Sequence, residues 1–379
     1  MKRKNKKTGI VVLILRAIGC IPCVLLTVAA LNIFALGSGA SSGGSQHSGA
    51  SYTVMDRYNI YTTNVISDAL EGVLSIPKVY WLSDSDLVAP EPRQSCYGET
   101  DDPATLQWLL EDAKVLLDGQ ESLFRTDVEI LPGSKVSYYL DETILVITWK
   151  QVIDHSVYTF SEVKIAHPTQ FRRFLAGGEF SSGAQYMVSE MAESVNAVVA
   201  ANGDFYSFRN LGIIVHDSQL MRMEGEKMDV CMIDGNGDLQ FVYAGEMTDQ
   251  AEVEAYIQEH GVRFSLAFGP IMIDEGVIQD VERPYPVGSG YKHNARAALG
   301  QLGRLHYLLA AVSAEPPYTQ GHTLSVFSEN LLELGCETAY NLDGGQSATI
   351  VMNDEVKNYV YERRISDIIY FATALPDGE

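Results

Sequence analysis

The stretch from Gly9 to Leu36 is almost wholly apolar, and it limits what the chain can fold into more than any other feature. It is longer than the roughly 20 residues that a helix needs to cross a bilayer. The preceding eight residues are rich in lysine and arginine and contain no carboxylate. The positive-inside rule therefore predicts a cytoplasmic basic tail over residues 1–8, a transmembrane anchor over 9–36, and a C-terminal part that faces the outside of the cell membrane.

A cleaved signal peptide is the alternative reading of the same stretch. The small residues between Ala35 and Ala40 would suit a signal peptidase. The apolar core of a signal peptide usually spans about 7–15 residues, and this run is longer. The sequence thus favours a retained anchor, and it leaves open whether the N-terminal segment is cleaved.

The charge of the chain excludes one class of partner. Its formal net charge is −22, and all the charged residues of its first sixteen positions are basic, so the remainder is more acidic still. Such a surface repels phosphate backbones, which argues against nucleic acid as a partner. An anionic substrate would have to enter a locally basic pocket. The three cysteines after the anchor, Cys96, Cys231 and Cys336, are too few and too widely spaced for a disulfide framework.

Composition divides the exported part into three segments. Residues 37–51 read GSGASSGGSQHSGAS and predict a flexible tether. Residues 52–124 have mixed signals and are interpreted as an N-terminal extension or cap. Residues 125–379 alternate short β-branched runs with helical spacing, which predicts a single extracytoplasmic α+β domain with a mixed β-sheet flanked by helices. Among the expected elements are strands at 156–165, 230–233, 239–242 and 338–342, and helices at 104–117, 180–193, 251–260 and 324–334.

The most informative short motif lies near the C-terminus. The predicted strand at 338–342 leads directly into Asp343, Gly344, Gly345, Gln346 and Ser347. A carboxylate at a strand end followed by two glycines suits a site where a ligand must approach bare backbone. A plain hairpin is the alternative, because Asp-Gly is also a common tight turn.

Two further segments strengthen the functional interpretation. Asn202, Gly203 and Asp204 follow another predicted strand in the same manner, so two strand-end loops are expected to share a cleft. Arg296 stands at the start of a small-residue strand, where a guanidinium could receive a phosphate or carboxylate through paired hydrogen bonds. A structural ion pair is an equally good explanation of Arg296. His216, at the end of the strand at 211–215, could donate to phosphate or act as an acid, or it could be only a hydrogen-bonded surface residue beside Asp217.

The signals for a metal or a cofactor are weak. The segment Asp234 to Asp238 imitates the start of a calcium loop, but it lacks the later glutamate and lies between two predicted strands, so a hairpin turn is favoured. The sequence has no histidine pair or cysteine cluster with metal-ligand spacing. We expect no cofactor, and a divalent cation at Asp204 and Asp343 is left open.

The order of segments resembles the phosphodiester glycosidase domain family, which includes the lysosomal mannose 6-phosphate uncovering enzyme and bacterial relatives associated with exopolysaccharide. The matching pieces are ANGDFY at 201–206, LGIIVHDSQLMR at 211–222, FGPIMIDEGV at 268–277, NARAALG at 294–300, GHTL at 321–324 and LGCETAYNLDGGQSAT at 334–349. Two departures stand out: Gln346 replaces the third glycine of the family's usual Asp-Gly-Gly-Gly-Ser-Ser, and Ala348 replaces its second serine.

The resemblance implies a hydrolase that cleaves a sugar-1-phosphodiester at the glycosyl C–O bond and releases a free sugar such as N-acetylglucosamine. Its partner would be a glycosyl phosphodiester or a phosphorylated surface glycan. Residues with an expected catalytic role are Asp343, Asp204 and Arg296. Residues expected to bind substrate are Asn202, Gly203, His216, Asn341, Gly344, Gly345, Ser347, Gly321 and Thr323.

Two other functions fit the same motifs. In one, the loops bind a cell-surface polysaccharide without catalysis. In the other, the enzyme is a phosphodiesterase that cuts the P–O bond and leaves a sugar phosphate.

Overall fold

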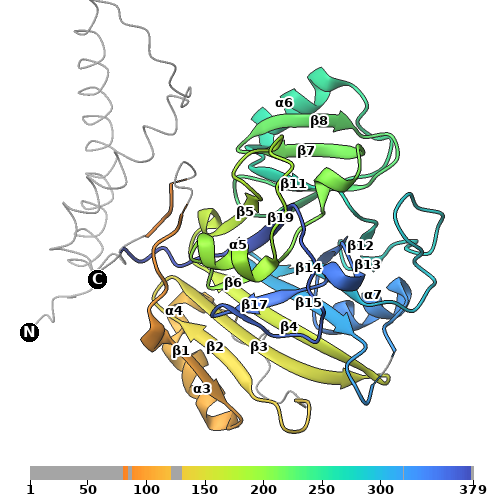
Figure 1. The fold of residues 1–379 in the computed structure, drawn as a ribbon. Helices are drawn as coiled ribbons and strands as arrows, with labels where there is room; N and C mark the ends of the chain where they lie inside the picture. Colours follow the sequence, from red (N-terminus) through yellow and green to blue (C-terminus); the bar gives the residue numbers. More distant parts are fainter. Residues whose placement is uncertain (1–79, 84–87, 121–129, 319, 377–379) are drawn as a thin grey trace, which may run out of the picture. The chain divides into compact units, whose positions relative to one another are not determined.

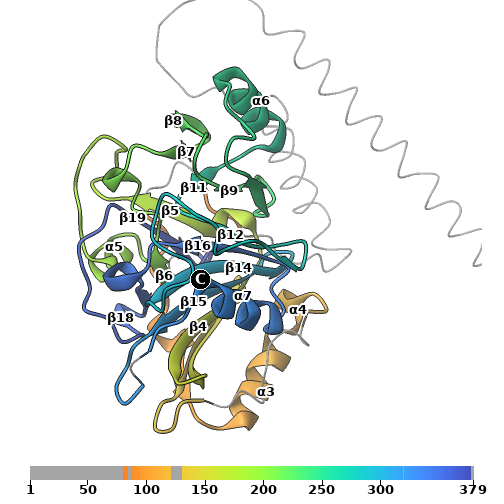
Figure 2. The same ribbon diagram turned by 90° about the vertical axis from the view of Figure 1, so that its right-hand side faces the viewer.

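The computed structural model describes residues 80–83, 88–120, 130–318 and 320–376. The expected basic tail, anchor and tether lie outside these residues. Within the described ranges, no helix is both long enough and apolar enough to span a membrane. Residues 78–379 form one compact unit (Figures 1 and 2).

The largest element of the described residues is a nine-stranded antiparallel sheet. Its order is β1-β2-β3-β4-β15-β14-β16-β12-β13. Long hairpins build its centre: β3 pairs with β4 over ten residues, and β4 then pairs with β15. The strands are β1 (Tyr97–Thr100), β2 (Val136–Leu140), β3 (Ile144–Ile153), β4 (Ser156–Ile165), β15 (His306–Ser313), β14 (Arg296–Gly303), β16 (Thr338–Leu342), β12 (Ile271–Asp274) and β13 (Val277–Ile278).

Smaller antiparallel sheets complete the strand layers. A five-stranded sheet has the order β18-β17-β6-β19-β5, a three-stranded sheet the order β10-β9-β11, and β7 pairs with β8. Their bounds are β18 (Glu355–Val356), β17 (Ile350–Met352), β6 (Val199–Asn202), β19 (Asp367–Phe371), β5 (Phe171–Leu175), β10 (Leu239–Val242), β9 (Val230–Ile233), β11 (Phe264–Leu266), β7 (Gly212–His216) and β8 (Gln219–Glu224).

The helices cover the outer faces of the sheets. Helices α3 (Pro103–Asp112), α4 (Lys114–Leu117) and α7 (Leu324–Glu333) share a hydrophobic cluster with one face of the nine-stranded sheet. Helix α5 (Val188–Ser194) packs on the five-stranded sheet. Helix α6 (Gln250–His260) packs with β7 and β9, at the opposite end of the unit from α3 (Figures 1 and 2). Asp249 caps α6 by accepting hydrogen bonds from Ala251 and Glu252.

Phe171 lies in the main core, where three of the sheets meet. Its ring stacks on Phe371 of β19 at 4.6 Å between centroids. It also contacts Tyr307 of β15 at 5.0 Å and meets Phe264 of β11 edge-on at 5.2 Å. The four rings therefore join the nine-, five- and three-stranded sheets in one packed cluster.

The α+β class is confirmed, and the sheets are more regular than expected. The pairings between the named strands are all antiparallel, whereas the predicted mixed sheet would contain parallel pairs as well. The strands expected at 156–165, 230–233, 239–242 and 338–342 have the predicted bounds. The turn between β9 and β10 is the hairpin that the sequence favoured, with Asp234 accepting hydrogen bonds from the backbone of Asn236 and Asp238.

The helix expected at 180–193 is shorter than predicted. Only Val188–Ser194 is helical, because the backbone of Tyr186 pairs with that of Ile365 in an isolated bridge and Gly183 adopts a positive φ. The predicted extension also contributes to the domain core. Its strand β1 pairs with β2 at the sheet edge, and α3 and α4 cover the sheet face.

The packing at Phe171 predicts a large effect on stability. Phe171→Ala should lower the free energy of unfolding by about 3–5 kcal/mol, because the cavity would open between three sheets that cannot all collapse into it. Phe208→Ala removes the same atoms from a ring that is 67% exposed and should change stability by less than about 0.5 kcal/mol. Chemical denaturation of both variants measures the difference, and equal values would contradict the core role of Phe171.

Candidate active site

The two predicted acid-glycine loops meet where the two larger sheets adjoin. Asn202 ends β6, and its side-chain Nδ2 donates to the backbone oxygen of Asp343, just after β16, at 2.8 Å. Its Oδ1 accepts a 3.2 Å hydrogen bond from the backbone nitrogen of Thr349. Asn202 is completely buried, so its amide fixes the two loops to each other without facing solvent.

Glycines in these loops are required by close approach. A Cβ on Gly203 would lie 1.9 Å from a carboxylate oxygen of Asp367. A Cβ on Gly344 would lie 2.6 Å from the backbone oxygen of Ala295. Both positions therefore exclude a side chain and bring bare backbone to the junction of the sheets. Gly345 donates its backbone N–H to the same Ala295 oxygen at 3.0 Å.

Asp343 is held by one of its two carboxylate oxygens. Its Oδ2 accepts hydrogen bonds from Ser347 Oγ at 2.7 Å and from Arg363 Nη2 at 2.6 Å. Arg363 Nε donates to Ser347 Oγ at 2.6 Å, which closes a three-residue ring of interactions. Oδ1 makes no hydrogen bond within the described part of the chain, and the side chain is 9% exposed. Asp343 thus keeps one oxygen available at the surface.

Arg363 was not predicted from the sequence. Its guanidinium also stacks over the Phe205 ring at 5.1 Å, and its side chain is 41% exposed. It therefore links the Asp343 loop to the segment that follows β6. It lies outside the matching pieces named above, so no sequence signal marked it.

Arg209 is a second unpredicted guanidinium near the carboxylates. Burial lowers its pKa, while Asp343 and then Asp204 raise it, so both acids lie within electrostatic reach. The guanidinium packs over the Phe268 ring at 4.8 Å and the Phe208 ring at 5.5 Å. Among the residues that the structure describes, it donates no hydrogen bond and forms no ion pair.

The loop that carries Arg209 is fixed from behind. Arg222 Nη1 donates to three backbone oxygens, those of Tyr206, Arg209 and Leu211, at 3.0, 2.7 and 3.2 Å. This single guanidinium closes the turn after η4 (Tyr206–Phe208). Arg209 is therefore presented on a held backbone, which lowers the entropy cost of binding an anion.

Asp204 occupies a different environment from Asp343. Its Oδ1 accepts from Arg173 Nη2 at 2.7 Å and from the backbone of Tyr206 at 2.9 Å. Its Oδ2 accepts from the backbone of Ala267 at 2.6 Å. The side chain has no exposed surface. Both oxygens are thus occupied, and Asp204 organises the site from behind.

Asp204 belongs to a buried cluster of two carboxylates and one guanidinium. Arg173 also donates to Asp367 Oδ2, through Nη2 at 2.8 Å and Nε at 3.1 Å. Burial raises the pKa of Asp204 to about 7, against the lowering effect of Arg173 and with a further rise from Asp367. His216 lies beside this cluster, where burial lowers its pKa, and its Nε2 is 3.6 Å from Asp217. No described contact joins His216 to Asp343.

The side chain of Arg296 is engaged away from the acids. Its Nε donates to the backbone oxygen of His322, and its Nη2 donates to those of Ser289, Gly290 and Lys292. It forms no ion pair with a described carboxylate, so the alternative of a structural ion pair is not seen among the described residues, and its predicted role toward phosphate stays a prediction. Arg296 instead fastens the loop before β14 to the segment before α7.

Of the remaining predicted residues, one contacts Asp343 and the others stabilise the surrounding backbone. Ser347 lies in the site through its bond to Asp343. Asn341 donates to the backbone oxygen of Gly269 at 2.6 Å. Gly321 packs against the backbone of Asn294, and Thr323 caps α7. Asn341, Gly321 and Thr323 thus support the backbone of segments near the site.

A metal site is not evident in the part of the chain that the structure describes. No group of three histidine, cysteine, aspartate or glutamate residues there is arranged to hold a metal ion. Asp343 already binds the positive guanidinium of Arg363 through Oδ2, and a positive charge this close disfavours a cation at the same carboxylate.

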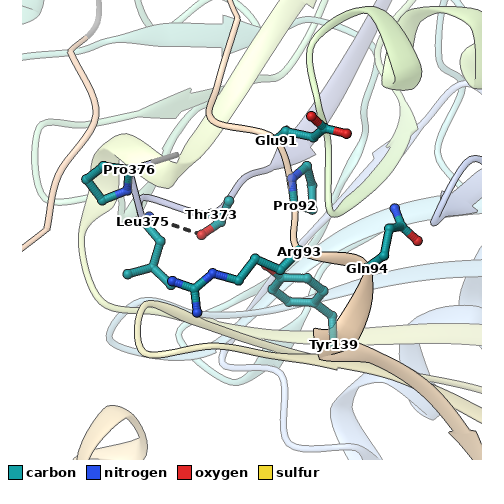
Figure 3. Close-up of a pocket in the computed structure, with 8 residues that line it drawn as sticks. All are labelled: Glu91, Pro92, Arg93, Gln94, Tyr139, Thr373, Leu375 and Pro376. Carbon is teal, nitrogen blue, oxygen red and sulfur yellow. Dashed lines mark hydrogen bonds between the residues drawn. The ribbon is translucent and has the colours of Figure 1, made fainter. Parts of the chain in front are cut away.

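A separate pocket of about 460 Å³ lies elsewhere in the unit (Figure 3). None of the predicted site residues lines it. Its walls come from the segment before β1, from β2 and from the C-terminal segment after β19: Glu91, Pro92, Arg93, Gln94, Tyr139, Thr373, Leu375 and Pro376.

Comparison with known proteins supports the resemblance seen in the sequence. Residues 195–372 match the family model of phosphodiester glycosidases. The matched segment, just under half of the chain, is similar to the phosphodiester glycosidases. It includes Asn202, Asp204, Arg209, Asp343 and Arg363, whereas Arg173 precedes it.

One curated relative is the human N-acetylglucosamine-1-phosphodiester alpha-N-acetylglucosaminidase, which is 26% identical over 193 residues. The match covers 45% of this chain and 35% of the human protein, so the chain spans about a third of that relative's length. The phosphodiester glycosidase family is thus one of hydrolases with a named human member.

Solved structures that match part of the chain include the zebrafish enzyme of the same name, as a catalytic domain auto-inhibited by its pro-peptide. It has a TM-score of 0.49 and 20% identity, over 61% of this chain and 83% of that one. A hypothetical protein from Synechocystis has a TM-score of 0.47 and 16% identity, over 65% of this chain and 64% of that one.

The buried cluster of Asp204, Asp367 and Arg173 predicts a pH effect on stability. Because the pKa of Asp204 is about 7 in the folded state and about 4 in an unfolded chain, the folded state binds this proton more tightly. The stabilisation that this bound proton gives to the folded state is therefore complete below about pH 4 and is lost as the pH rises through 7. Asp204→Asn removes this titration.

Denaturation of both proteins between pH 4 and 8 measures the effect. The stability of the parent chain relative to the Asp204→Asn variant should fall with rising pH across this range. A difference that is independent of pH would contradict the proton-binding role of Asp204.

Proposed function

We propose that the chain hydrolyses a sugar-1-phosphodiester at the bond between the anomeric carbon and the phosphate oxygen, releasing a free sugar such as N-acetylglucosamine. The observation that carries the proposal is the paired arrangement of Asp343 and Arg363. One carboxylate oxygen is fixed by the guanidinium while the other stays open to a substrate. The match of residues 195–372 to a hydrolase family supports the same reaction class.

Arg363 and Arg209 are suited to bind the phosphate. Arg209 has no described hydrogen-bond partner and lies within electrostatic reach of Asp343, and Arg363 is partly exposed. Guanidinium groups bind phosphate oxygens through paired, charge-assisted hydrogen bonds. They also stabilise the negative charge that gathers on phosphate as the glycosyl bond breaks. In this proposal, these two residues supply the local positive charge that an anionic substrate needs within this acidic chain.

Asp343 is suited to act on the sugar side of the same bond. In the proposed reaction, the oxygen of water bonds to the anomeric carbon, the C–O electron pair leaves with the phosphate, and the water proton passes to Asp343 Oδ1. The negative charge of Asp343 also stabilises the oxocarbenium-like sugar. A phosphate monoester leaves readily, so this reaction does not need a second carboxylate as an acid. That requirement agrees with Asp204, whose oxygens are both occupied.

We further propose that the reaction takes place outside the cell membrane, on phosphorylated surface glycans. The basic N-terminal flank and the apolar run from Gly9 to Leu36 support an exported domain. The acidic remainder of the chain suits a diffusible or surface-borne glycan more than a nucleic acid.

Asp343→Asn should lower kcat for N-acetylglucosamine-1-phosphate methyl diester by about 10²–10⁴-fold, because an amide neither accepts the proton nor stabilises the sugar cation. Asp354→Asn changes an exposed carboxylate in the turn before β18 and serves as the matched control. Release of N-acetylglucosamine is measured by mass spectrometry. In water labelled with ¹⁸O, the label should enter the sugar; label in the phosphate would establish P–O cleavage and contradict the proposal.

Arg363→Ala should lower kcat/KM for the same diester by about 10²-fold or more, because it removes a phosphate donor and the partner of Asp343 Oδ2. Its neighbour offers a matched control: Arg364 is 59% exposed and has only a 3.9 Å contact to Glu190. Arg364→Ala should retain parent activity. Equal kinetics of the two variants would remove Arg363 from the site.

A further inference from the structure

Phe205, the residue that packs against Arg363 of the proposed site, has a strained backbone. Its φ is +52°, in the left-handed region that bulky side chains rarely adopt. The residue is only 6% exposed, and the Arg363 guanidinium lies over its ring at 5.1 Å. Such a conformation persists only where the surroundings hold it, and strain of this kind gathers at functional sites. The contact that holds Phe205 is therefore informative about the site.

The side chain of Asp367, on β19, holds this backbone. Its Oδ1 accepts a hydrogen bond from the backbone nitrogen of Phe205 at 2.9 Å, and its Oδ2 accepts one from that of Asp204 at 3.2 Å. Asp367 is completely buried, and a hydrogen bond in so dry a place is stronger than one in water. Gly203 permits the close approach, because a Cβ there would lie 1.9 Å from Oδ2. One carboxylate thus fixes two consecutive peptide groups just after β6.

Charge pairing with Arg173 does not by itself explain Asp367. Arg173 donates to Asp367 Oδ2 through Nε and Nη2, and its Nη2 also donates to Asp204 Oδ1. A single guanidinium balances the charge of one carboxylate, and burying a second one carries a further cost of desolvation. Both Arg173 contacts of Asp367 are made by Oδ2, whereas Oδ1 accepts from the Phe205 backbone and from the Ser366 hydroxyl. The two oxygens of Asp367 therefore have separate roles.

We propose that Asp367 is a positioning residue for the hydrolysis and acts through Phe205 on Arg363. By holding Phe205 in the left-handed conformation, Asp367 fixes the aromatic surface over which the guanidinium packs. Arg363 in turn donates to Asp343 Oδ2 and, in the proposed function, to the phosphate. This inference rests on the proposed function, because the placement of Arg363 affects the reaction only if Arg363 takes part in it.

Two changes isolate the hydrogen bond to Phe205 from the rest of the cluster. Asp367→Asn keeps the shape of the side chain but has one acceptor oxygen. Three N–H groups, two from Arg173 and one from Asp204, converge on Oδ2. The Asn oxygen should take that side, so that its amide nitrogen faces the Phe205 N–H and the bond is lost. An ester in place of the Phe205 amide, introduced as phenyllactate by nonsense suppression, deletes the same donor and leaves the Asp367 charge intact.

Each change should lower kcat/KM of the full 379-residue chain for N-acetylglucosamine-1-phosphate methyl diester by about tenfold or more. In an Arg363→Ala background, the same changes should alter kcat/KM by less than about twofold, because the group that they position is gone. A merely structural role would lower kcat/KM by the same factor in both backgrounds.

Asp141→Asn is the matched control. This carboxylate, in the turn between β2 and β3, is also buried and also accepts hydrogen bonds from backbone nitrogens, those of Thr143 and Ile144. The variant should keep the parent kcat/KM. A loss as large as that of Asp367→Asn would overturn the positioning role, since any buried carboxylate would then have the same effect.

The remaining outcomes separate the two proposals. Parent kcat/KM in the ester variant, or equal factors in the two backgrounds, overturns the positioning role. If Asp367→Asn does not fold, the ester variant decides by the same measurements. If the parent chain does not cleave the diester, the proposed function fails, and crystal structures of the parent and the ester variant decide the positioning role. A Phe205 ring that moves away from Arg363 in the ester variant supports it, and an unmoved ring overturns it.

Discussion

The side chain of Asn202 is the interaction on which the site depends. It is buried at the end of β6, and it bonds in one direction to Asp343 after β16 and in the other to Thr349 before β17. One amide therefore joins the ends of strands from two sheets. A buried amide whose partners were removed would leave unpaired polar groups, at a cost of about 1–3 kcal/mol each, so the junction has a single stable arrangement. The position of Asp343 follows from it.

Arginines with the same chemistry have three different roles around this junction. Arg173 neutralises the buried acids Asp204 and Asp367. Arg222 and Arg296 donate their hydrogen bonds to backbone oxygens and thereby fix loops. Arg363 and Arg209 alone combine partial exposure with nearness to Asp343. An acidic chain can thus offer locally positive groups, because burial and hydrogen bonding decide which guanidinium groups remain for a ligand.

Much of the fold was predictable because the secondary structure that the local sequence patterns favour is the one that the folded protein contains. The strand β4 and the hairpin of β9 and β10 have the expected bounds, since β-branched runs end there at turn residues. The helix at 180–193 was overestimated, because the apolar residues before Val188 enter a loop that pairs with Ile365. The segment 97–117 looked like a separate cap, and only long-range pairing with β2 shows that it completes the sheet.

The sequence by itself determined that two acid-glycine loops follow strands and that they carry the family's motifs, because these features are local. The tertiary structure decided what each acid and arginine does. Asp204 and Asp343 have similar sequence surroundings, yet one is enclosed by Arg173 and backbone N–H groups and the other keeps an open oxygen. Arg209 and Arg363 lie 154 positions apart in the chain, and no local pattern relates them. Their nearness to Asp343 arises only when the sheets pack, because burial and charge pairing depend on neighbours that are distant in sequence.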